Sequence, residues 1–329
     1  MVNGVEPSML IDKVISKIEH FDKILLMIHE NPDGDTLAAA SAVFLCLEKI
    51  GKKPAMVCKD PVPRPFLFLP KMDKIQPDFL FGDFDIILVL DCGDIRRTGF
   101  DERLKNFAKK KQKTLINIDH HPKNDLHKIA NLNLVDYTAS STSEIIWELL
   151  LKMKVEINKD IATALFTGLY TDTGGFKHSN TTSKTLKIAA ELMRHGARAK
   201  LVSRNVSLSK SVPAMKLWGV ALSRLHRNSV FKISSSVITQ KDLENCGANY
   251  EDIAGVVNLI NTIPDSKAAI LFYETEDKKV RASIRTEDDK TDVSRLAQIF
   301  GGGGHKKASG FTINGHFRFH GAEWEIVFD

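Results

Sequence analysis

The chain has 329 residues, of which 43% are hydrophobic and 26% charged, and its formal net charge is +5. This length accommodates two domains, and the composition is that of a folded soluble protein with a sizeable core. No apolar run approaches the roughly 20 residues that span a bilayer, so we expect no membrane segment. A mildly basic charge permits anionic substrates without indicating nucleic acid.

The cysteines are scattered and form no CxxC pair; they are Cys46, Cys58, Cys92 and Cys246. This pattern argues against a zinc ribbon or a disulfide framework and fits a reducing compartment. The start, MVNGVEPSMLIDK, lacks the basic and apolar regions of a signal peptide. We therefore expect a cytoplasmic protein.

The first two hundred residues alternate apolar runs with helical patterns. Strands are predicted at residues 23–29, 55–58, 85–90 and 114–118, and helices at 36–50, 101–111, 143–153, 159–171 and 183–195. Gly51 is well placed to end the helix at 36–50. Strands alternating with helices predict an α/β domain with a mainly parallel sheet flanked by helices.

A second, smaller α/β domain is predicted after a stretch of small and polar residues. We place the first domain at 1–200, a linker at 201–213 and the second domain at 214–329. Within the second domain we expect helices at 214–225 and 292–300, and strands at 230–239, 268–274, 279–285 and 311–313.

Acidic and histidine residues gather where predicted strands end. His29 closes the first strand, with Asp33 and Asp35 in the turn that follows, and Asp91 follows DIILVL. Asp119, His120 and His121 follow TLINI, whereas Asp172 follows a helix. In an open parallel sheet, ligands bind beyond the carboxyl ends of the strands, so these clusters should converge on one edge.

Converging carboxylates repel one another unless a cation lies among them, or unless one takes up a proton. We therefore expect two divalent metals. Imidazole and carboxylate ligands without thiolate suit manganese, iron, cobalt or zinc better than calcium. A metal pair roughly 3.5–4 Å apart can clamp a phosphoryl group for in-line attack. Each motif alone has a plainer interpretation as a polar turn or a cap, and only their joint occurrence favours the metals.

These residues resemble the DHH phosphoesterase superfamily. The resemblance lies in HENPDGD (29–35), DCGD (91–94), DHH (119–121) and TDTGGF (171–176). The later stretches VRASIR (280–285) and DVSRLAQIFGGGGHKKASGFTI (292–313) resemble the DHH-associated domain of RecJ-type and NrnA-type nucleases. The resemblance implies an active site in the cleft between the two domains, and relatives are often homodimers.

The resemblance implies a role for each residue of the first domain. One metal is expected on His29, Asp33 and Asp91, and the second on Asp35, Asp91, His120 and Asp172, with Asp91 bridging. His121 would face the substrate phosphate, and Asp91, His121 and Asp119 form the expected catalytic group. Manganese is the expected ion, with magnesium, cobalt or zinc as alternatives. Asp94 can orient a ligand or cap a helix.

The second domain is expected to bind the far end of the substrate. Arg285 and Arg281 would contact a terminal phosphate, and strand alternation places both on one face with Ser283. Gly302, Gly303 and Gly304 would let the backbone approach a phosphate, and His305 would donate to it. His178 is a further substrate contact. The alternatives are that the arginines lie on a solvent-exposed face of the sheet and that the glycine run is only a flexible end to a helix.

The expected function is hydrolysis of short RNA, of linear dinucleotides such as pApA, and of 3′-phosphoadenosine 5′-phosphate. The alternatives are a RecJ-like single-strand exonuclease and a soluble cyclic-dinucleotide phosphodiesterase. No long basic stripe or aromatic platform for single strands is evident, which favours short substrates. GGGGH and VRASIR argue against a pyrophosphatase. A nucleotide-binding regulatory module without turnover is the alternative from a different class.

Overall fold

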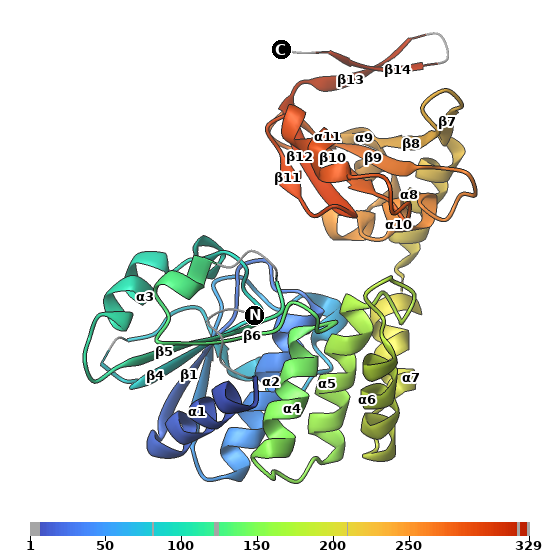
Figure 1. Ribbon diagram of the computed structural model, residues 1–329. Coiled ribbons are helices and arrows are strands. Elements are labelled where there is room, and N and C mark those ends of the chain that lie inside the picture. The colour runs from blue at the N-terminus through green and yellow to red at the C-terminus, as the bar shows by residue number, and fades with distance from the viewer. Residues whose placement is uncertain (1–6, 81, 122–124, 209, 321–322, 328–329) are drawn as a thin grey trace. The chain divides into compact units, whose positions relative to one another are not determined.

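The computed structural model describes residues 7–80, 82–121, 125–208, 210–320 and 323–327. The chain divides into two compact units, Met1–Ser209 and Lys210–Asp329 (Figure 1). Each unit has its own sheet and its own core.

The N-terminal unit is built on a six-stranded parallel sheet with the strand order β3-β2-β1-β4-β5-β6. Its strands are β1 (Lys23–Met27), β2 (Lys53–Val57), β3 (Ile75–Gln76), β4 (Ile86–Leu90), β5 (Thr114–Asp119) and β6 (Leu132–Val135). Its helices are α1 (Pro7–His20), α2 (Gly34–Lys49), α3 (Asp101–Ala108), α4 (Thr142–Lys152), α5 (Lys159–Asp172), α6 (Ser183–Arg194) and α7 (Ala199–Ser203). The predicted parallel α/β architecture is confirmed.

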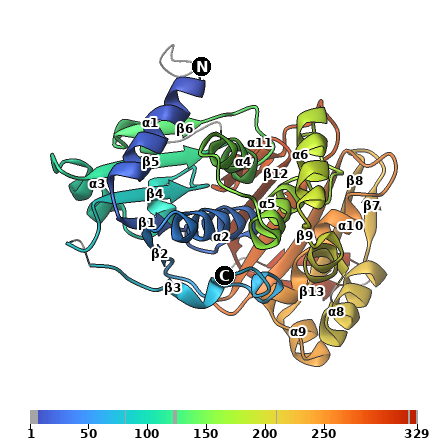
Figure 2. The ribbon, with the colours of Figure 1, turned by 90° about the horizontal axis from the view of Figure 1, so that it is seen from below.

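Both faces of this sheet are covered, which explains why its central strands are apolar throughout. Ile24 and Leu26 of β1 face the core formed with α1, α2, α4 and α5, whereas Leu25 and Met27 face a second core that contains Leu104 of α3. Figure 1 shows α2, α4 and α5 along one side of the sheet and α3 along the other. Seen from below, β1, β4 and β5 run side by side (Figure 2).

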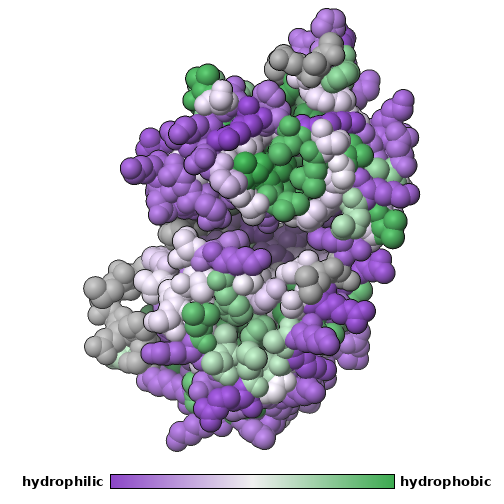
Figure 3. Space-filling view, turned by 90° about the vertical axis from the view of Figure 1, so that its right-hand side faces the viewer, coloured by the Kyte–Doolittle hydropathy of each residue, from purple (hydrophilic) through white to green (hydrophobic). Residues whose placement is uncertain are grey.

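Helix α6 of this unit has buried apolar residues on one side and exposed apolar residues on another. Ile188 and Leu192 point into the core, whereas Leu186 and Met193 are 50% and 55% exposed. Figure 3 shows apolar surface on the side of the unit where α6 and α7 lie.

The C-terminal unit has a mixed six-stranded sheet in the order β11-β12-β10-β9-β8-β7, in which only β8 and β9 pair in parallel. Its strands are β7 (His226–Asn228), β8 (Ile233–Ile238), β9 (Ala268–Thr275), β10 (Lys279–Arg285), β11 (Gly303–Gly304) and β12 (Ala308–Asn314). Helices α8 (Val212–Ser223), α9 (Gln240–Cys246) and α10 (Val256–Ile260) cover one face, and α11 (Val293–Ile299) covers the other.

Some elements differ from the sequence expectation. The stretch predicted as linker, 201–213, contains the end of α7, a π-helical turn at Arg204–Leu208 and the start of α8. Beyond β12 the chain forms a hairpin of β13 (His316–His320) and β14 (Glu323–Val327), where no element was predicted. Helices α1, α7, α9 and α10 and strands β3, β6, β7 and β11 were also missed.

Candidate metal centre

The predicted ligands meet at the point where the strand order of the parallel sheet reverses. Strand β1 lies beside β4, and β4 beside β5, so the carboxyl ends of these strands share one edge. His29, Asp91 and Asp119 stand at these ends. Because β1 and β4 are neighbours that are distant in sequence, this edge is a topological switch point, where such sheets bind ligands.

The HENPDGD loop holds His29 and Asp33 toward each other. His29 is buried, and its Nδ1 lies 2.8 Å from the carbonyl oxygen of Glu30, which leaves Nε2 3.7 Å from Asp33 Oδ2. Asp33 Oδ1 caps α2 by accepting hydrogen bonds from the backbone N–H groups of Asp35 and Thr36, both at 3.2 Å. The cap uses one oxygen of Asp33 and directs the other to His29.

Asp35 is held by the amino end of a different helix. Its two carboxylate oxygens accept from the backbone N–H groups of Thr142 at 2.6 Å and Ser143 at 3.1 Å, in the first turn of α4. Burial, followed by the negative charge of Asp91, raises the pKa of Asp35 to about 7. The helix end therefore orients a carboxylate that would otherwise tend to take up a proton.

Asp91 lies directly after β4 with a left-handed backbone, at φ 57°. This conformation is uncommon outside glycine, asparagine and aspartate. Thr142 Oγ1 donates to Asp91 Oδ1 at 2.9 Å. Burial, followed by the charges of Asp33 and Asp172, raises the pKa of Asp91 to about 7.

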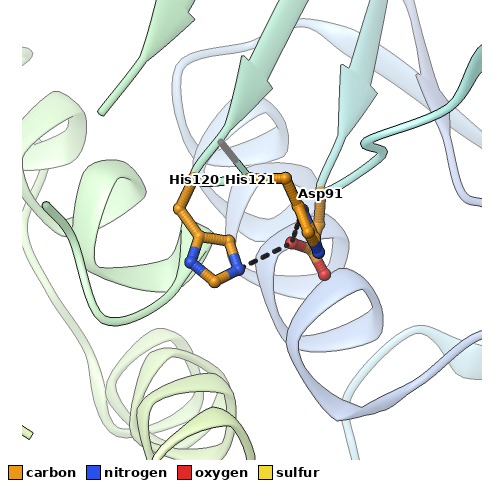
Figure 4. Close-up of side chains that lie close together, drawn as sticks. All are labelled: Asp91, His120 and His121. Carbon is orange, nitrogen blue, oxygen red and sulfur yellow. Dashed lines mark ion pairs between the residues drawn. The ribbon is translucent and has the colours of Figure 1, made fainter. Parts of the chain in front are cut away.

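The two histidines of the DHH motif approach Asp91 from the end of β5 (Figure 4). His120 Nε2 lies 3.5 Å from Asp91 Oδ1 and 3.1 Å from Asp172 Oδ2, and His121 Nδ1 lies 3.7 Å from Asp91 Oδ1. Burial lowers the pKa of His120, but the hydrogen bond with Asp172 and the surrounding carboxylates outweigh it and raise the value to about 10.

Asp119 faces His121. Its Oδ1 accepts from the ring of His121 at 2.7 Å and from the backbone N–H groups of His120 and His121 at 2.8 and 3.2 Å. These three contacts fix the orientation of the Asp119 carboxylate and of the His121 ring beside it.

Three groups of residues could each hold a metal ion, because within each group the donor atoms lie within 4.8 Å of one another. The groups are His29–Asp33–Asp91, Asp35–His120–Asp172 and Asp91–His120–His121. Asp91 belongs to two groups, as does His120. The pKa values of Asp35, Asp91 and Asp172 are raised to about 7, which means that their ionised forms are unfavourable unless a positive charge lies nearby. Mixed imidazole and carboxylate donors suit a first-row divalent cation, so the residues present fit metal binding.

Sequence reasoning missed the segment that supports these ligands, Ser140–Glu144. Ser141 caps α4, and Thr142 and Ser143 hold Asp35 and Asp91 as described above. Gly168 of α5 makes room here, because a Cβ at this position would collide with Asp35 Oδ1 and Ser143 Oγ. A signal was available, since Ser141 and Glu144 match the S-x-x-E pattern of a helix start.

His178 lies behind Asp172. Its Nδ1 is 3.3 Å from the carbonyl oxygen of Asp172, which also accepts from Asn180 Nδ2 at 3.2 Å. His178 thus contacts the main chain of the predicted ligand Asp172. Asp94, for which two roles were open, caps the turn Ile95–Thr98 and pairs with Arg96.

Two buried thiols adjoin the centre. Cys58 Sγ donates to the carbonyl oxygen of His29 at 3.3 Å, and Cys92 Sγ donates to that of Asp94 at 3.0 Å. Burial raises the pKa of Cys58 to about 11 and that of Cys92 to about 12. Both therefore stay protonated.

In the C-terminal unit, β10 presents Arg281, Ser283 and Arg285 on one face, as alternation predicted. Arg285 is half-buried, and its Nη1 donates to the carbonyl oxygen of Ile284 at 2.9 Å. No ion pair among the described residues includes Arg281 or Arg285.

The glycine run has a structural role within the same sheet. A Cβ at Gly302 would collide with the carbonyl oxygen of Gly310, and one at Gly304 would meet that of Ala308 at 2.6 Å. A Cβ at Gly303 would meet nothing within 4 Å. His305 lies in the exposed turn between β11 and β12. Close packing of β11 on β12 thus accounts for Gly302 and Gly304, and Gly303 and His305 remain candidates for phosphate contact.

Comparison with known proteins gives two domain matches. Residues 23–169 match the DHH family N-terminal domain, and residues 235–320 match the DHHA1 domain. No helix in the described part of the chain is long and apolar enough to cross a membrane.

Curated relatives match over most of their length. A Thermus thermophilus protein named bifunctional oligoribonuclease and PAP phosphatase NrnA is 30% identical over 313 residues, which cover 94% of this chain and 89% of the relative. The Bacillus subtilis protein of the same name is 30% identical over 92% of each chain.

A solved structure has the same fold throughout. The crystal structure of an exopolyphosphatase-related protein from Bacteroides fragilis matches with a TM-score of 0.86 and 25% identity, covering 98% of this chain and 94% of that chain. The domain matches and the identity to curated relatives show that this protein belongs to the DHH family of phosphoesterases and is a hydrolase acting on phosphate ester bonds.

Proposed function

We propose that the protein uses two divalent metal ions, preferably manganese, to hydrolyse short RNA and linear dinucleotides such as pApA to mononucleotides, and 3′-phosphoadenosine 5′-phosphate to AMP. The observation that carries the two-metal proposal is the position of Asp91, which lies within ligand distance of both His29–Asp33 and His120–His121. The substrates are proposed because the relatives named above are oligoribonucleases and PAP phosphatases.

The first metal would be held by His29, Asp33 and Asp91, and the second by Asp35, His120 and Asp172, with Asp91, which lies 3.5 Å from His120, as the bridging ligand. When bound, the metals would supply Lewis acidity that activates water and withdraws charge from the phosphoryl group. Asp35 and Asp91 are pre-oriented for this task by the amino end of α4 and by Thr142. Such outer contacts fix ligand geometry in metal enzymes.

His121 is proposed to contact the phosphoryl group. The His121 ring lies beside the centre, with Nδ1 2.7 Å from Asp119 Oδ1 and 3.7 Å from Asp91 Oδ1. Interaction with Asp119 and Asp91 outweighs the effect of burial and raises the pKa of His121, which favours the protonated form that can donate to a phosphoryl oxygen. In the reaction, water attacks phosphorus, the P–O ester bond breaks, and the departing oxygen takes up a proton.

The C-terminal unit is proposed to bind the part of the substrate away from the bond that is cleaved. Arg285 carries this proposal, because a half-buried guanidinium without a carboxylate partner among the described residues is suited to an anion. Arg281 lies on the same strand face and is exposed.

The test is a substrate panel with manganese present, comprising short RNAs, pApA, cyclic dinucleotides, 3′-phosphoadenosine 5′-phosphate, pyrophosphate and long single-stranded DNA. We expect AMP from pApA and from 3′-phosphoadenosine 5′-phosphate, with no pyrophosphate cleavage. If long DNA or cyclic dinucleotides are cleaved faster than pApA and short RNA, the proposed substrates are wrong. Binding of pApA without release of AMP would contradict the proposed turnover.

A further inference from the structure

Arg97 lies against the predicted metal ligand His29. It belongs to the turn Ile95–Thr98 that follows β4, and its Nη2 is 3.1 Å from His29 Nδ1 and 3.4 Å from His29 Nε2. The main chain fixes this position, because the carbonyl oxygen of Arg97 accepts from the N–H of Glu30 at 2.5 Å. The arginine is therefore tied to the loop that carries His29 and Asp33.

The contact with His29 does not satisfy the guanidinium. His29 Nδ1 faces the carbonyl oxygen of Glu30 at 2.8 Å and so carries the proton, which leaves Nε2, at 3.4 Å, as the one acceptor that His29 offers to the five N–H donors of Arg97. No ion pair between described residues includes Arg97, whereas its neighbour Arg96 pairs with Asp94 through both Nε and Nη2. Arg97 is thus a positioned cation with donors to spare, and Arg96 is not.

A guanidinium beside His29 is electrostatically unfavourable for a cation at His29, Asp33 and Asp91, because like charges at short range repel. An anion between the two positive charges reverses the sign of this interaction. The planar fork of arginine matches the oxygens of a phosphoryl group and binds them in a bidentate manner.

We propose that Arg97 binds a non-bridging oxygen of the substrate phosphoryl group, on the side of the site formed by His29, Asp33 and Asp91. The inference rests on the proposed phosphoesterase function and adds a specificity-determining residue to it. The ligand it recognises is a phosphate monoester or diester of a nucleotide. Arg97 would thereby complete the phosphoryl site from within the N-terminal unit.

The test compares Arg97→Ala, Arg97→Lys and Arg97→Gln with the matched control Arg96→Ala. For manganese-loaded protein we expect Arg97→Ala to lower kcat/KM on pApA by about 10- to 100-fold, the range for a lost charge-assisted contact. Arg97→Lys should retain part of the activity, because it keeps the charge but loses the fork. Arg97→Gln, which is shorter and neutral, should resemble Arg97→Ala, and Arg96→Ala should resemble wild type.

Two readouts do not depend on turnover. Manganese binding, followed by electron paramagnetic resonance, should be unchanged or tighter in Arg97→Ala, because a repelling charge is removed. Inorganic phosphate, titrated calorimetrically into the manganese-loaded protein, should bind Arg97→Ala about 10-fold more weakly than wild type or Arg96→Ala.

Equal phosphate affinity in Arg97→Ala and Arg96→Ala would overturn the inference, as would loss of manganese binding in folded Arg97→Ala, because the arginine would then only support His29. If wild-type protein cleaves no nucleotide, the proposed function fails. The phosphate titration then still decides whether Arg97 binds phosphate.

Discussion

Asp91 combines two demands that few residues meet together. Its backbone is left-handed, at φ 57°, and its carboxylate lies within ligand distance of donors from β1 and β5. Only aspartate and asparagine among the polar side chains of this size adopt this conformation readily. The backbone turn and the proposed metal bridge are therefore properties of one residue, and they can be separated by substitution.

We predict that Asp91→Asn folds as wild type and loses activity, whereas Asp91→Ala loses activity and stability. Asparagine keeps the left-handed turn and can still accept from Thr142, but it lacks the charge that holds two cations. Alanine also loses the preference for this conformation, at a cost of about 1–2 kcal/mol. Activity should fall by more than the roughly 10- to 100-fold typical of outer contacts.

Thermal unfolding of the two metal-free variants and turnover of pApA with manganese check this prediction. Both substitutions remove the same buried charge, so the difference between Asn and Ala measures the backbone preference together with the hydrogen bond from Thr142. Turnover of Asp91→Asn at the wild-type rate would rule out Asp91 as the bridging ligand.

Arg285→Ala is expected to raise the KM for pApA more than it lowers kcat, because the residue is proposed to bind away from the reacting phosphorus. A rise in KM of about 10-fold corresponds to a lost charge-assisted hydrogen bond. Arg281→Ala is the matched comparison, since Arg281 lies on the same face of β10 but is exposed. Steady-state kinetics that place the whole loss in kcat would move Arg285 to the reacting centre.

At the scale of elements, α4 and α5 shape the site, although the only proposed ligand on them is Asp172, the last residue of α5. The amino end of α4 holds Asp35, and α5 passes close enough that only glycine fits at position 168. Gly34, at the start of α2, likewise has no room for a Cβ, because Thr171 of α5 occupies that space. Small residues here allow helices to pack against the ligand-bearing loop.

We expect Gly168→Ala to weaken manganese binding and to destabilise the protein by about 1–3 kcal/mol, the usual cost of overpacking. The added methyl group would displace the carboxylate of Asp35. Gly219→Ala in the middle of α8 is the control, because a Cβ there meets nothing within 4 Å. It should stabilise the protein by about 0.5–1 kcal/mol through its helix preference.

Chemical denaturation and manganese titration of both glycine variants measure these effects. Wild-type manganese affinity in Gly168→Ala would mean that Asp35 has more freedom than its contacts with α4 imply.

Strands β1, β2, β4 and β5 and most helices of the N-terminal unit were predictable from their apolar patterns, whereas the edge strands β3 and β6 are short and not fully buried. The convergence of His29, Asp91 and Asp119 followed from strand order alone. Thr142 and Arg97 could not be found in this way, because their contacts with Asp91 and His29 join segments from different connections. The hairpin β13–β14 was missed although the turn signal Asn314-Gly315 stands directly before the alternating run HFRFH.

At the scale of the whole molecule, every proposed metal ligand lies within the N-terminal unit, and the proposed contact with the far end of the substrate lies in the C-terminal unit. The cleft between the units and the homodimer stay predictions. The charge balance of the protein as a whole depends on whether the metal centre is filled, since its carboxylates are buried.

We predict that manganese raises the melting temperature more at about pH 8 than at about pH 6. In the metal-free protein, the pKa values of Asp35, Asp91 and Asp172 are raised from 3.8 to about 7. Such carboxyl groups favour the folded state while protonated, and this contribution is lost as the pH rises from about 4 to about 7. The pKa of His120 is raised from 6.5 to about 10, so the stability that its protonated form contributes is lost as the pH rises from about 6.5 to about 10.

Calorimetric melting with and without manganese, over this pH range, measures the effect. Asp172→Asn serves as the comparison, because it removes one of the titrating groups and should flatten the pH dependence of the metal-free protein. A manganese effect that decreases with rising pH would contradict the prediction.

The buried thiols of Cys58 and Cys92 have a consequence for metal selectivity. Sulfur lies beside the centre, yet both thiols donate hydrogen bonds to main-chain carbonyl oxygens and remain protonated far above neutral pH. Soft ions such as cadmium, which seek thiolate, thus find only oxygen and nitrogen donors. We therefore expect cadmium, if it enters the proposed metal centre, to bind there without thiolate ligands.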